Sequence, residues 1–205
     1  MGLRQGDLSH PQNRLLAAWL LPGVIIGIAA VLAVYGDSGR EWLRFDRAAI
    51  MSGEYWRFVS GHLVHLGLSH LMLNAAGFLL IWFLISAYFD PRLWLVITVS
   101  VIIGIDLGFW FLEPDLQWYV GLSGLLHGLL AAGVVGGIRS GRVDVWVLGA
   151  ALIGKLAYEQ MLGPLPGSEE SSGGAVIVAA HAYGALAGAI MAAVIMIRVR
   201  TPPPI

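Results

Sequence analysis

Long apolar stretches occupy most of this 205-residue chain, and they restrict its fold more than any other feature. A helix needs about 20 predominantly apolar residues to cross the hydrocarbon core of a bilayer. Charged residues make up 12% of the chain, against about 25% in a soluble domain. We therefore expect an all-α polytopic membrane protein, folded as a single domain over residues 1–205. Six membrane spans are predicted, at about 15–35, 68–89, 93–112, 122–138, 145–162 and 175–197.

The arginines are spread unequally between the two sides that six spans would create. If the N-terminus is cytoplasmic, more of them fall in cytoplasmic segments than in extracytoplasmic ones, so the positive-inside rule predicts that both termini are cytoplasmic. The long loop 36–67 is then extracytoplasmic. The cytoplasmic set is Arg4, Arg14, Arg92, Arg139, Arg142, Arg198 and Arg200, and the extracytoplasmic set is Arg40, Arg44, Arg47 and Arg57.

Composition also excludes several classes of function. The formal net charge of -1 leaves no basic surplus for binding nucleic acid. The sequence contains no cysteine, which rules out disulfides, thiolate metal sites and cysteine nucleophiles. Glycine is abundant, with 27 residues, about 13% of the chain against a usual value of about 7%. In a membrane protein this enrichment predicts helices whose backbones pack closely.

A serine between glycines opens the fourth apolar stretch, in the segment Gly121-Leu122-Ser123-Gly124. Ser123 is a candidate nucleophile, because the glycines let a substrate backbone approach its hydroxyl. A helix N-terminus there would also offer free N–H groups to a developing oxyanion. The alternative is that this Gly-x-Ser-Gly segment serves only as a helix-packing surface.

An ionisable side chain, His181, lies in the sixth apolar stretch, and intramembrane histidines are uncommon enough to suggest a function. Gly184 and Gly188 follow it with the Gly-x-x-x-Gly spacing that permits close contact between helices. We expect this face to meet the glycines of the fourth stretch and to bring His181 within hydrogen-bonding distance of Ser123. The imidazole could then act as general base toward the serine hydroxyl.

Three histidines precede or begin the second apolar stretch: His62, His65 and His70. His70 and Asn74 are four residues apart and share one helix face, where both could donate hydrogen bonds to an oxyanion. For His62 and His65 we favour a structural role, in which they cap the helix or hold the loop by hydrogen bonds. A zinc site is the less favoured alternative, because the spacing is uneven and no convincing carboxylate ligand lies nearby.

Taken in order, these motifs resemble those of rhomboid-family intramembrane serine proteases. The resemblance covers the whole predicted six-helix core, and we expect a rhomboid-like bundle. It rests on Trp56-Arg57 in the first loop, His70 and Asn74 in the second helix, the Gly-x-Ser-Gly segment 121–124 and the Ala-His-x-x-Gly-x-x-x-Gly segment 180–188.

The family resemblance also implies roles for these residues. Ser123 would be the nucleophile and His181 the general base of a catalytic dyad that needs no metal or cofactor. His70 and Asn74 would stabilise the oxyanion together with the backbone N–H of Ser123. The function implied is a serine endopeptidase that cuts within membranes.

His127 departs from the commonest rhomboid pattern, which places a tyrosine four residues after the serine. It could support the base by packing against or hydrogen-bonding His181, and the less favoured alternative is that His127 is itself the base. The segment Gly-Leu-Ser-Gly-x-Leu-His-Gly in a compact chain resembles the rhombosortase branch. That resemblance implies membrane-anchored substrates of a bacterial inner membrane, namely exported proteins with glycine-rich C-terminal sorting tails, cut on the extracytoplasmic side.

Three charged residues fall inside the predicted spans. Asp106 either orients a histidine as a third catalytic residue or, as we prefer, pairs with another polar group. Lys155 and Glu159 are four residues apart on one helix, and we interpret them as a structural ion pair.

Two other classes of protein remain as alternatives to a protease. One is a non-catalytic rhomboid-like protein that binds or chaperones membrane helices, although such proteins usually lose the serine or the histidine. The other is a small transporter with a histidine proton relay, which the clustering of polar residues toward one membrane face disfavours.

Overall fold

The computed structural model describes residues 11–198, with side chains from Trp19 onward, and folds them almost entirely into helices. The predicted cytoplasmic positions of Arg4, Arg14 and Arg200 therefore concern side chains outside the described part. The helices are α1 (Pro11–Ala33), α2 (Gly36–Leu43), α3 (Arg47–Met51), α4 (Arg57–Ser60), α5 (Leu68–Ile85), η1 (Ser86–Tyr88), α6 (Pro91–Leu112), α7 (Ser123–Gly137), η2 (Ile138–Ser140), α8 (Val143–Leu162), α9 (Ser168–Ser172) and α10 (Val178–Arg198), and the strands are β1 (Phe45–Asp46) and β2 (Trp118–Tyr119).

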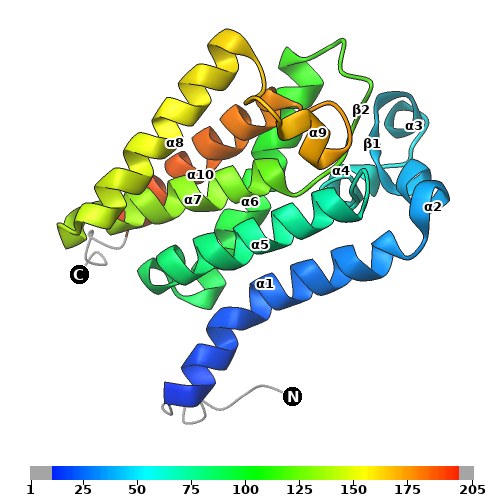
Figure 1. The fold of residues 1–205 in the computed structure, drawn as a ribbon. Coiled ribbons are helices and arrows are strands. Elements are labelled where there is room, and N and C mark those ends of the chain that lie inside the picture. The colour runs from blue at the N-terminus through cyan, green and yellow to red at the C-terminus, as the bar shows by residue number, and fades with distance from the viewer. Residues whose placement is uncertain (1–10, 199–205) are drawn as a thin grey trace.

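Six long helices, α1, α5, α6, α7, α8 and α10, coincide with the predicted apolar stretches (Figure 1). Local signals define some of their ends. At the start of α6, the carboxylate of Asp90 accepts hydrogen bonds from the backbone N–H groups of Arg92 and Leu93, and Pro91 occupies the first turn, where its missing N–H costs nothing.

Length and apolarity support fewer membrane spans than the six predicted. Among the described residues, three helices are long and apolar enough: Leu68–Tyr88, Pro91–Leu112 and Val178–Arg198. A fourth candidate is the pair Trp19–Ala33 and Gly36–Leu43, which is bent by 120°. Helix α7 has 15 residues, hence a length of about 22 Å against a hydrocarbon core of about 30 Å. The complete set of six spans stays a prediction.

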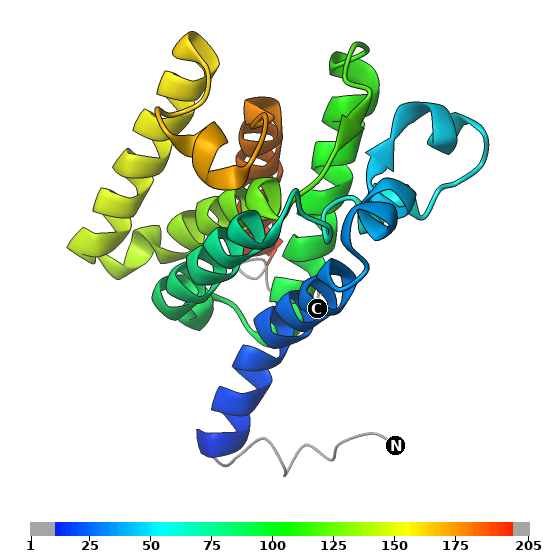
Figure 2. The same cartoon turned by 45° about the vertical axis from the view of Figure 1, so that its right-hand side comes forward.

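Helix α7 lies at the centre of the bundle and contacts α5, α6, α8 and α10, whereas α1 lies at the edge beside α5 (Figures 1 and 2). Its glycine and alanine side lets neighbouring helices approach closely, and its leucines join a core that contains Phe78, Trp82 and Phe109, none of them exposed. Large apolar side chains such as Phe83 and Phe111 point outward, as expected for helices that face lipid.

The loop predicted at 36–67 is ordered into short helices and one strand, which the sequence analysis had not anticipated. The buried guanidinium of Arg57 holds it together, because it donates to the carbonyl oxygens of Glu41 (2.9 Å) and Arg44 (3.0 Å) and pairs with the carboxylate of Glu54 (2.7 Å). Strand β1 pairs antiparallel with β2, with Phe45 opposite Tyr119. The loop is thereby fixed to the segment that leads into α7.

A second arginine of this loop, Arg47, ties it to the end of α6. Its guanidinium donates to the carbonyl oxygens of Phe109 (2.5 Å), Glu113 (2.8 Å) and Leu116 (3.0 Å). The last carbonyls of a helix lack partners within the helix, and a cation there also offsets the negative end of the helix dipole. Arg47 therefore caps α6 from a segment more than 60 residues earlier in the chain.

Candidate active site

Ser123 is the first residue of α7, and its hydroxyl lies 3.0 Å from Nε2 of His181 in α10. The turn before it requires glycine, because Gly121 has a φ of +120°, a conformation that other residues rarely adopt. The hydroxyl of Tyr119 donates to the Gly121 carbonyl oxygen at 2.6 Å, and the Gly121 N–H donates to the carbonyl oxygen of Gly61 at 3.1 Å. These bonds fix the position from which Ser123 starts its helix.

Close contact between α7 and α10 brings the two side chains together, as the glycine spacing predicts. A Cβ added to Gly184 would collide with the carbonyl oxygen of Gly124, and one added to Gly188 would collide with that of Gly128. Only glycine allows the two backbones to approach this closely.

The other ring nitrogen of His181 has a carboxylate partner. Nδ1 lies 2.9 Å from Oε2 of Glu159, which projects from α8 and is 2% exposed. The second carboxylate oxygen, Oε1, accepts from Nζ of Lys155 at 2.5 Å. The predicted Lys155–Glu159 pair is present, but the sequence analysis missed the contact with His181. The four-residue spacing of the pair had offered a complete explanation for Glu159.

His127 lies one helical turn after Ser123 and stacks on His181, with ring centroids 4.1 Å apart and planes 16° apart. Its Nδ1 donates to the backbone carbonyl oxygen of Ser123 at 2.7 Å. The serine hydroxyl faces Nε2 of His181 at 3.0 Å. The packing of His127 against His181 agrees with the preferred sequence-based expectation, and this geometry disfavours His127 as the base.

The five residues predicted for the site line one cavity of about 210 Å³ at the end of the bundle where α7 and α10 begin. Helix α9 lies across this end in Figure 1 and contributes serines to the cavity wall. The predicted set is His70, Asn74, Ser123, His127 and His181.

His70 and Asn74 occupy the opposite wall from α10, on the first turns of α5. The Leu66 N–H points at Nδ1 of His70 at 3.5 Å, an arrangement that leaves the ring proton on Nε2. That nitrogen lies against Gly121, where an added Cβ would come within 3.0 Å of it. Nδ2 of Asn74 is buried and has no hydrogen-bond partner within residues 11–198. A buried donor without a partner is available to an incoming acceptor.

The two histidines of the loop before α5, His62 and His65, do not line this cavity. Nε2 of His62 lies 3.2 Å from Oδ1 of Asp106, so Asp106 pairs with a loop histidine rather than with His181, and His62 has the structural role we favoured. His65 differs from our expectation of hydrogen bonding: it packs edge-on against the ring of His70 at 5.0 Å, and its ring nitrogens have no partner in the described chain. Burial lowers the pKa of His65 to about 3.

A metal ion does not fit the most suitable cluster of ligands. Potential ligand atoms of His127, Glu159 and His181 lie within 4.8 Å of one another. The rings of the two histidines are stacked, however, so their in-plane lone pairs run side by side and do not converge on one ion. Ser123 and Lys155 already occupy other donors and acceptors of this cluster.

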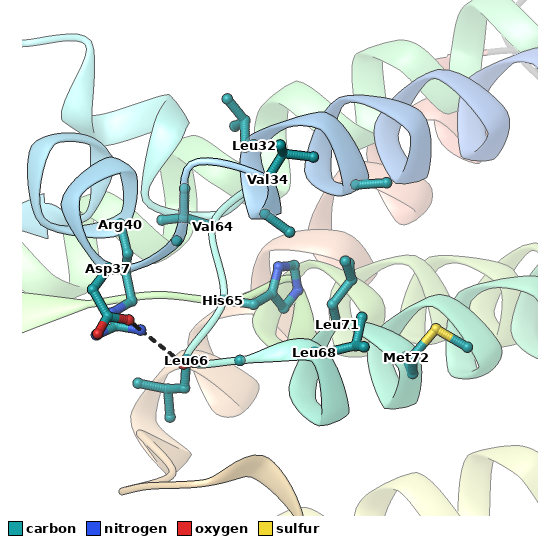
Figure 3. A pocket seen from close by; sticks show the side chains of 14 residues that line it. Leu32, Val34, Asp37, Arg40, Val64, His65, Leu66, Leu68, Leu71 and Met72 are labelled. Atoms are coloured by element: carbon teal, nitrogen blue, oxygen red, sulfur yellow. Dashed lines mark hydrogen bonds and ion pairs between the residues drawn. The ribbon is translucent and has the colours of Figure 1, made fainter.

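A second, larger cavity of about 440 Å³ lies between the end of α1, the start of α2 and the start of α5 (Figure 3). Its walls are mainly apolar side chains such as Leu68, Leu71 and Met72. Among the lining residues, Arg40 donates to the Leu66 carbonyl oxygen at 2.8 Å. None of the residues that line this second cavity also lines the cavity around Ser123.

Residues 52–198, nearly three quarters of the chain, match the Rhomboid domain family. The chain belongs to the rhomboid family. Rhomboids are intramembrane serine proteases that act on membrane protein substrates, so the family supplies the general kind of activity and the membrane location. In this rhomboid the Trp56-Arg57 pair lies in the matched region, and Arg57 is the residue that organises the loop before α5.

Proposed function

We propose that this rhomboid is an active serine endopeptidase in which Ser123 and His181 form the catalytic dyad. Nε2 of His181 takes the hydroxyl proton while Oγ of Ser123 attacks the scissile carbonyl carbon. The protonated imidazole then donates to the leaving amine, and water hydrolyses the acyl-enzyme by the reverse proton path. The observation that carries this proposal is the 3.0 Å contact between the serine hydroxyl and the imidazole.

Stabilisation of the oxyanion is the role we propose for His70 and Asn74, together with the backbone N–H of Ser123. The Ser123 N–H lies at the N-terminus of α7, where the first four N–H groups have no partner within the helix. The unpartnered Nδ2 of Asn74 supports the assignment, because an oxyanion is the acceptor it lacks.

Labelling with a serine-reactive fluorophosphonate tests the dyad. We expect the purified, folded protein to be labelled and both Ser123→Ala and His181→Ala to abolish labelling. Ser100→Ala is the matched control, because the Ser100 hydroxyl lies in α6 and donates to the carbonyl oxygen of Val96 in the same helix. Labelling that survives Ser123→Ala would contradict the proposal.

The proposed substrates are membrane-anchored proteins of a bacterial inner membrane, cut on the extracytoplasmic side. The distribution of arginines supports this orientation. The likeness to the rhombosortase branch adds the finer proposal that the substrate is an exported protein with a glycine-rich C-terminal sorting tail. Glycine near the scissile bond suits the reaction, because weak helix propensity makes the backbone easier to expose.

Co-expression with an exported protein that carries such a tail tests the substrate class. Mass spectrometry should find a new C-terminus within or beside the glycine-rich segment, and His181→Ala should abolish it. Cleavage of a membrane substrate that lacks the tail, with the tailed one left intact, would contradict the rhombosortase assignment while leaving the dyad in place. The non-catalytic alternative predicts no cleavage of either.

A further inference from the structure

We infer that Glu159 is a positioning residue that completes a Ser123–His181–Glu159 relay, so that this rhomboid works with a carboxylate behind its base. The inference deepens the proposed function and rests on it. Its foundation is a continuous line of contacts from the Ser123 hydroxyl to Nε2 of His181 at 3.0 Å and from Nδ1 to Oε2 of Glu159 at 2.9 Å.

The position of the proton on the His181 imidazole determines whether the ring can act as a base. His181 can accept the serine proton only if Nε2 carries a lone pair, and in a neutral ring this places the proton on Nδ1. A carboxylate oxygen is an acceptor and favours that form. Glu159 therefore selects the tautomer that general base catalysis needs, and it stabilises the imidazolium that forms when Ser123 reacts.

Lys155 offers the only competing contact to Nδ1 in the described chain, and it would favour the wrong tautomer. Its ammonium group lies 3.4 Å from Nδ1 and has no lone pair to offer, so a hydrogen bond between them would require a bare Nδ1 and a proton on Nε2. The Glu159 oxygen is nearer, at 2.9 Å. The ammonium hydrogen bonds instead to the other carboxylate oxygen of Glu159.

The surroundings of Glu159 hold the carboxylate in place. The side chain is 2% exposed, and each oxygen has a cationic or N–H partner. A buried carboxylate without partners would be costly, and Lys155 compensates its charge from one turn earlier on α8. The side chain of Lys155 is 30% exposed and lines the cavity around Ser123, while the carboxylate that faces His181 is 2% exposed.

Helix α8 contacts the ring of His181 at an edge that neither Ser123 nor His127 occupies. His127 restrains the ring plane of His181 by stacking, and Ser123 contacts one edge. A partner on the Nδ1 edge adds a second restraint on the imidazole to the Ser123 contact at Nε2. Glu159 provides that partner.

Nuclear magnetic resonance of protein with ¹⁵N-labelled histidine provides the deciding test, since it reports the tautomer without substrate. The spectrum of His181, assigned by its loss in His181→Ala, should show a neutral ring with the proton on Nδ1. Glu159→Gln should lower the population of this form, whereas Glu113→Gln should not. Glu113 is a matched control because its carboxylate accepts a hydrogen bond from Tyr183, also in α10, away from the dyad.

Kinetics supply the second readout. Glu159→Gln should lower the rate of fluorophosphonate labelling about 100-fold or more. Glu159→Asp should recover part of that rate, because it keeps a carboxylate. Lys155→Met, which removes the ion pair and leaves the carboxylate facing His181, should lose less than Glu159→Gln.

The outcomes separate the inference from the proposed function. A wild-type His181 ring with its proton on Nε2 would overturn the role of Glu159, whether or not any variant folds. Equal losses in Glu159→Gln and Lys155→Met, with an unchanged His181 tautomer, would reduce Glu159 to a structural ion-pair partner. Labelling that fails in wild-type protein with the Nδ1 proton in place would instead contradict the protease proposal.

Discussion

The ring of His127 lies nearly parallel to that of His181, with centroids 4.1 Å apart. A stacked aromatic pair contributes about 0.5–1.5 kcal/mol beyond its buried area, which corresponds to roughly a 2- to 10-fold change in rate if the stack acts on the base. We expect His127→Ala to lower kcat/KM in this range and His127→Tyr, which keeps a ring at the position, to stay near the wild-type value. Equal activities of the Ala and Tyr variants, with unchanged pH profiles, would remove any special role for this residue.

Substitution of Asn74 should separate catalysis from stability. Its Nδ2 has no partner in the described chain, so Asn74→Ala removes no hydrogen bond made by that atom. If Asn74 donates to the oxyanion, kcat should fall about 10²- to 10³-fold with little change in KM. The measurement is cleavage kinetics on a tailed substrate beside a thermal unfolding curve of the same preparation. A rise in KM with an unchanged kcat would show that Asn74 binds the substrate without specifically stabilising the transition state.

A methyl group on the α10 glycine face should destabilise the protein. In Gly188→Ala the new Cβ meets the carbonyl oxygen of Gly128, a backbone atom that cannot move alone. We expect a loss of about 1–3 kcal/mol in the free energy of unfolding, with lower activity because α7 and α10 are forced apart. Gly154→Ala is the matched control, because an added Cβ there meets nothing within 4 Å and alanine favours a helix. Similar unfolding temperatures for the two variants would refute the close-contact argument.

Acid should weaken the fold through His65. Burial lowers its folded pKa to about 3, while the unfolded value stays near 6.5, so between these values the unfolded chain binds more protons. The contribution of His65 to the free energy of unfolding is therefore fully present above about pH 6.5. It declines as the pH falls, by about 2 kcal/mol at pH 5. His65→Phe keeps an aromatic ring against His70 and should flatten the dependence of unfolding temperature on pH. An unchanged slope in His65→Phe would assign the acid sensitivity to other groups.

Much of the fold was predictable because apolar stretches bounded by charges and turn residues define long helices on their own. The proximity of Ser123 and His181 was also predictable, because the glycines that bring their two helices into contact lie beside them in the sequence. Rhomboid membership supports the general activity that those motifs imply.

Other features depend on tertiary structure and leave no local signal. The contact of Glu159 with His181 joins two helices. It could not be predicted from the sequence, because Lys155, four residues earlier, already provides a partner for the Glu159 carboxylate. The short helices α2, α3 and α4 are polar or brief, and they form because Arg57 and Arg47 gather carbonyl groups from distant segments. Nothing in the spacing of those arginines indicates which carbonyls they reach.

The glycine contact between α7 and α10 also determines which parts of this rhomboid can move. With backbone against backbone at Gly184 and Gly188, the two helices are in direct contact, so we expect the separation of Ser123 and His181 to change little. We therefore expect a substrate helix to enter through elements outside this pair, without disturbing the contact between Ser123 and His181. Glu159 is the exception, because it belongs to α8, so the support we infer for His181 depends on the position of that helix.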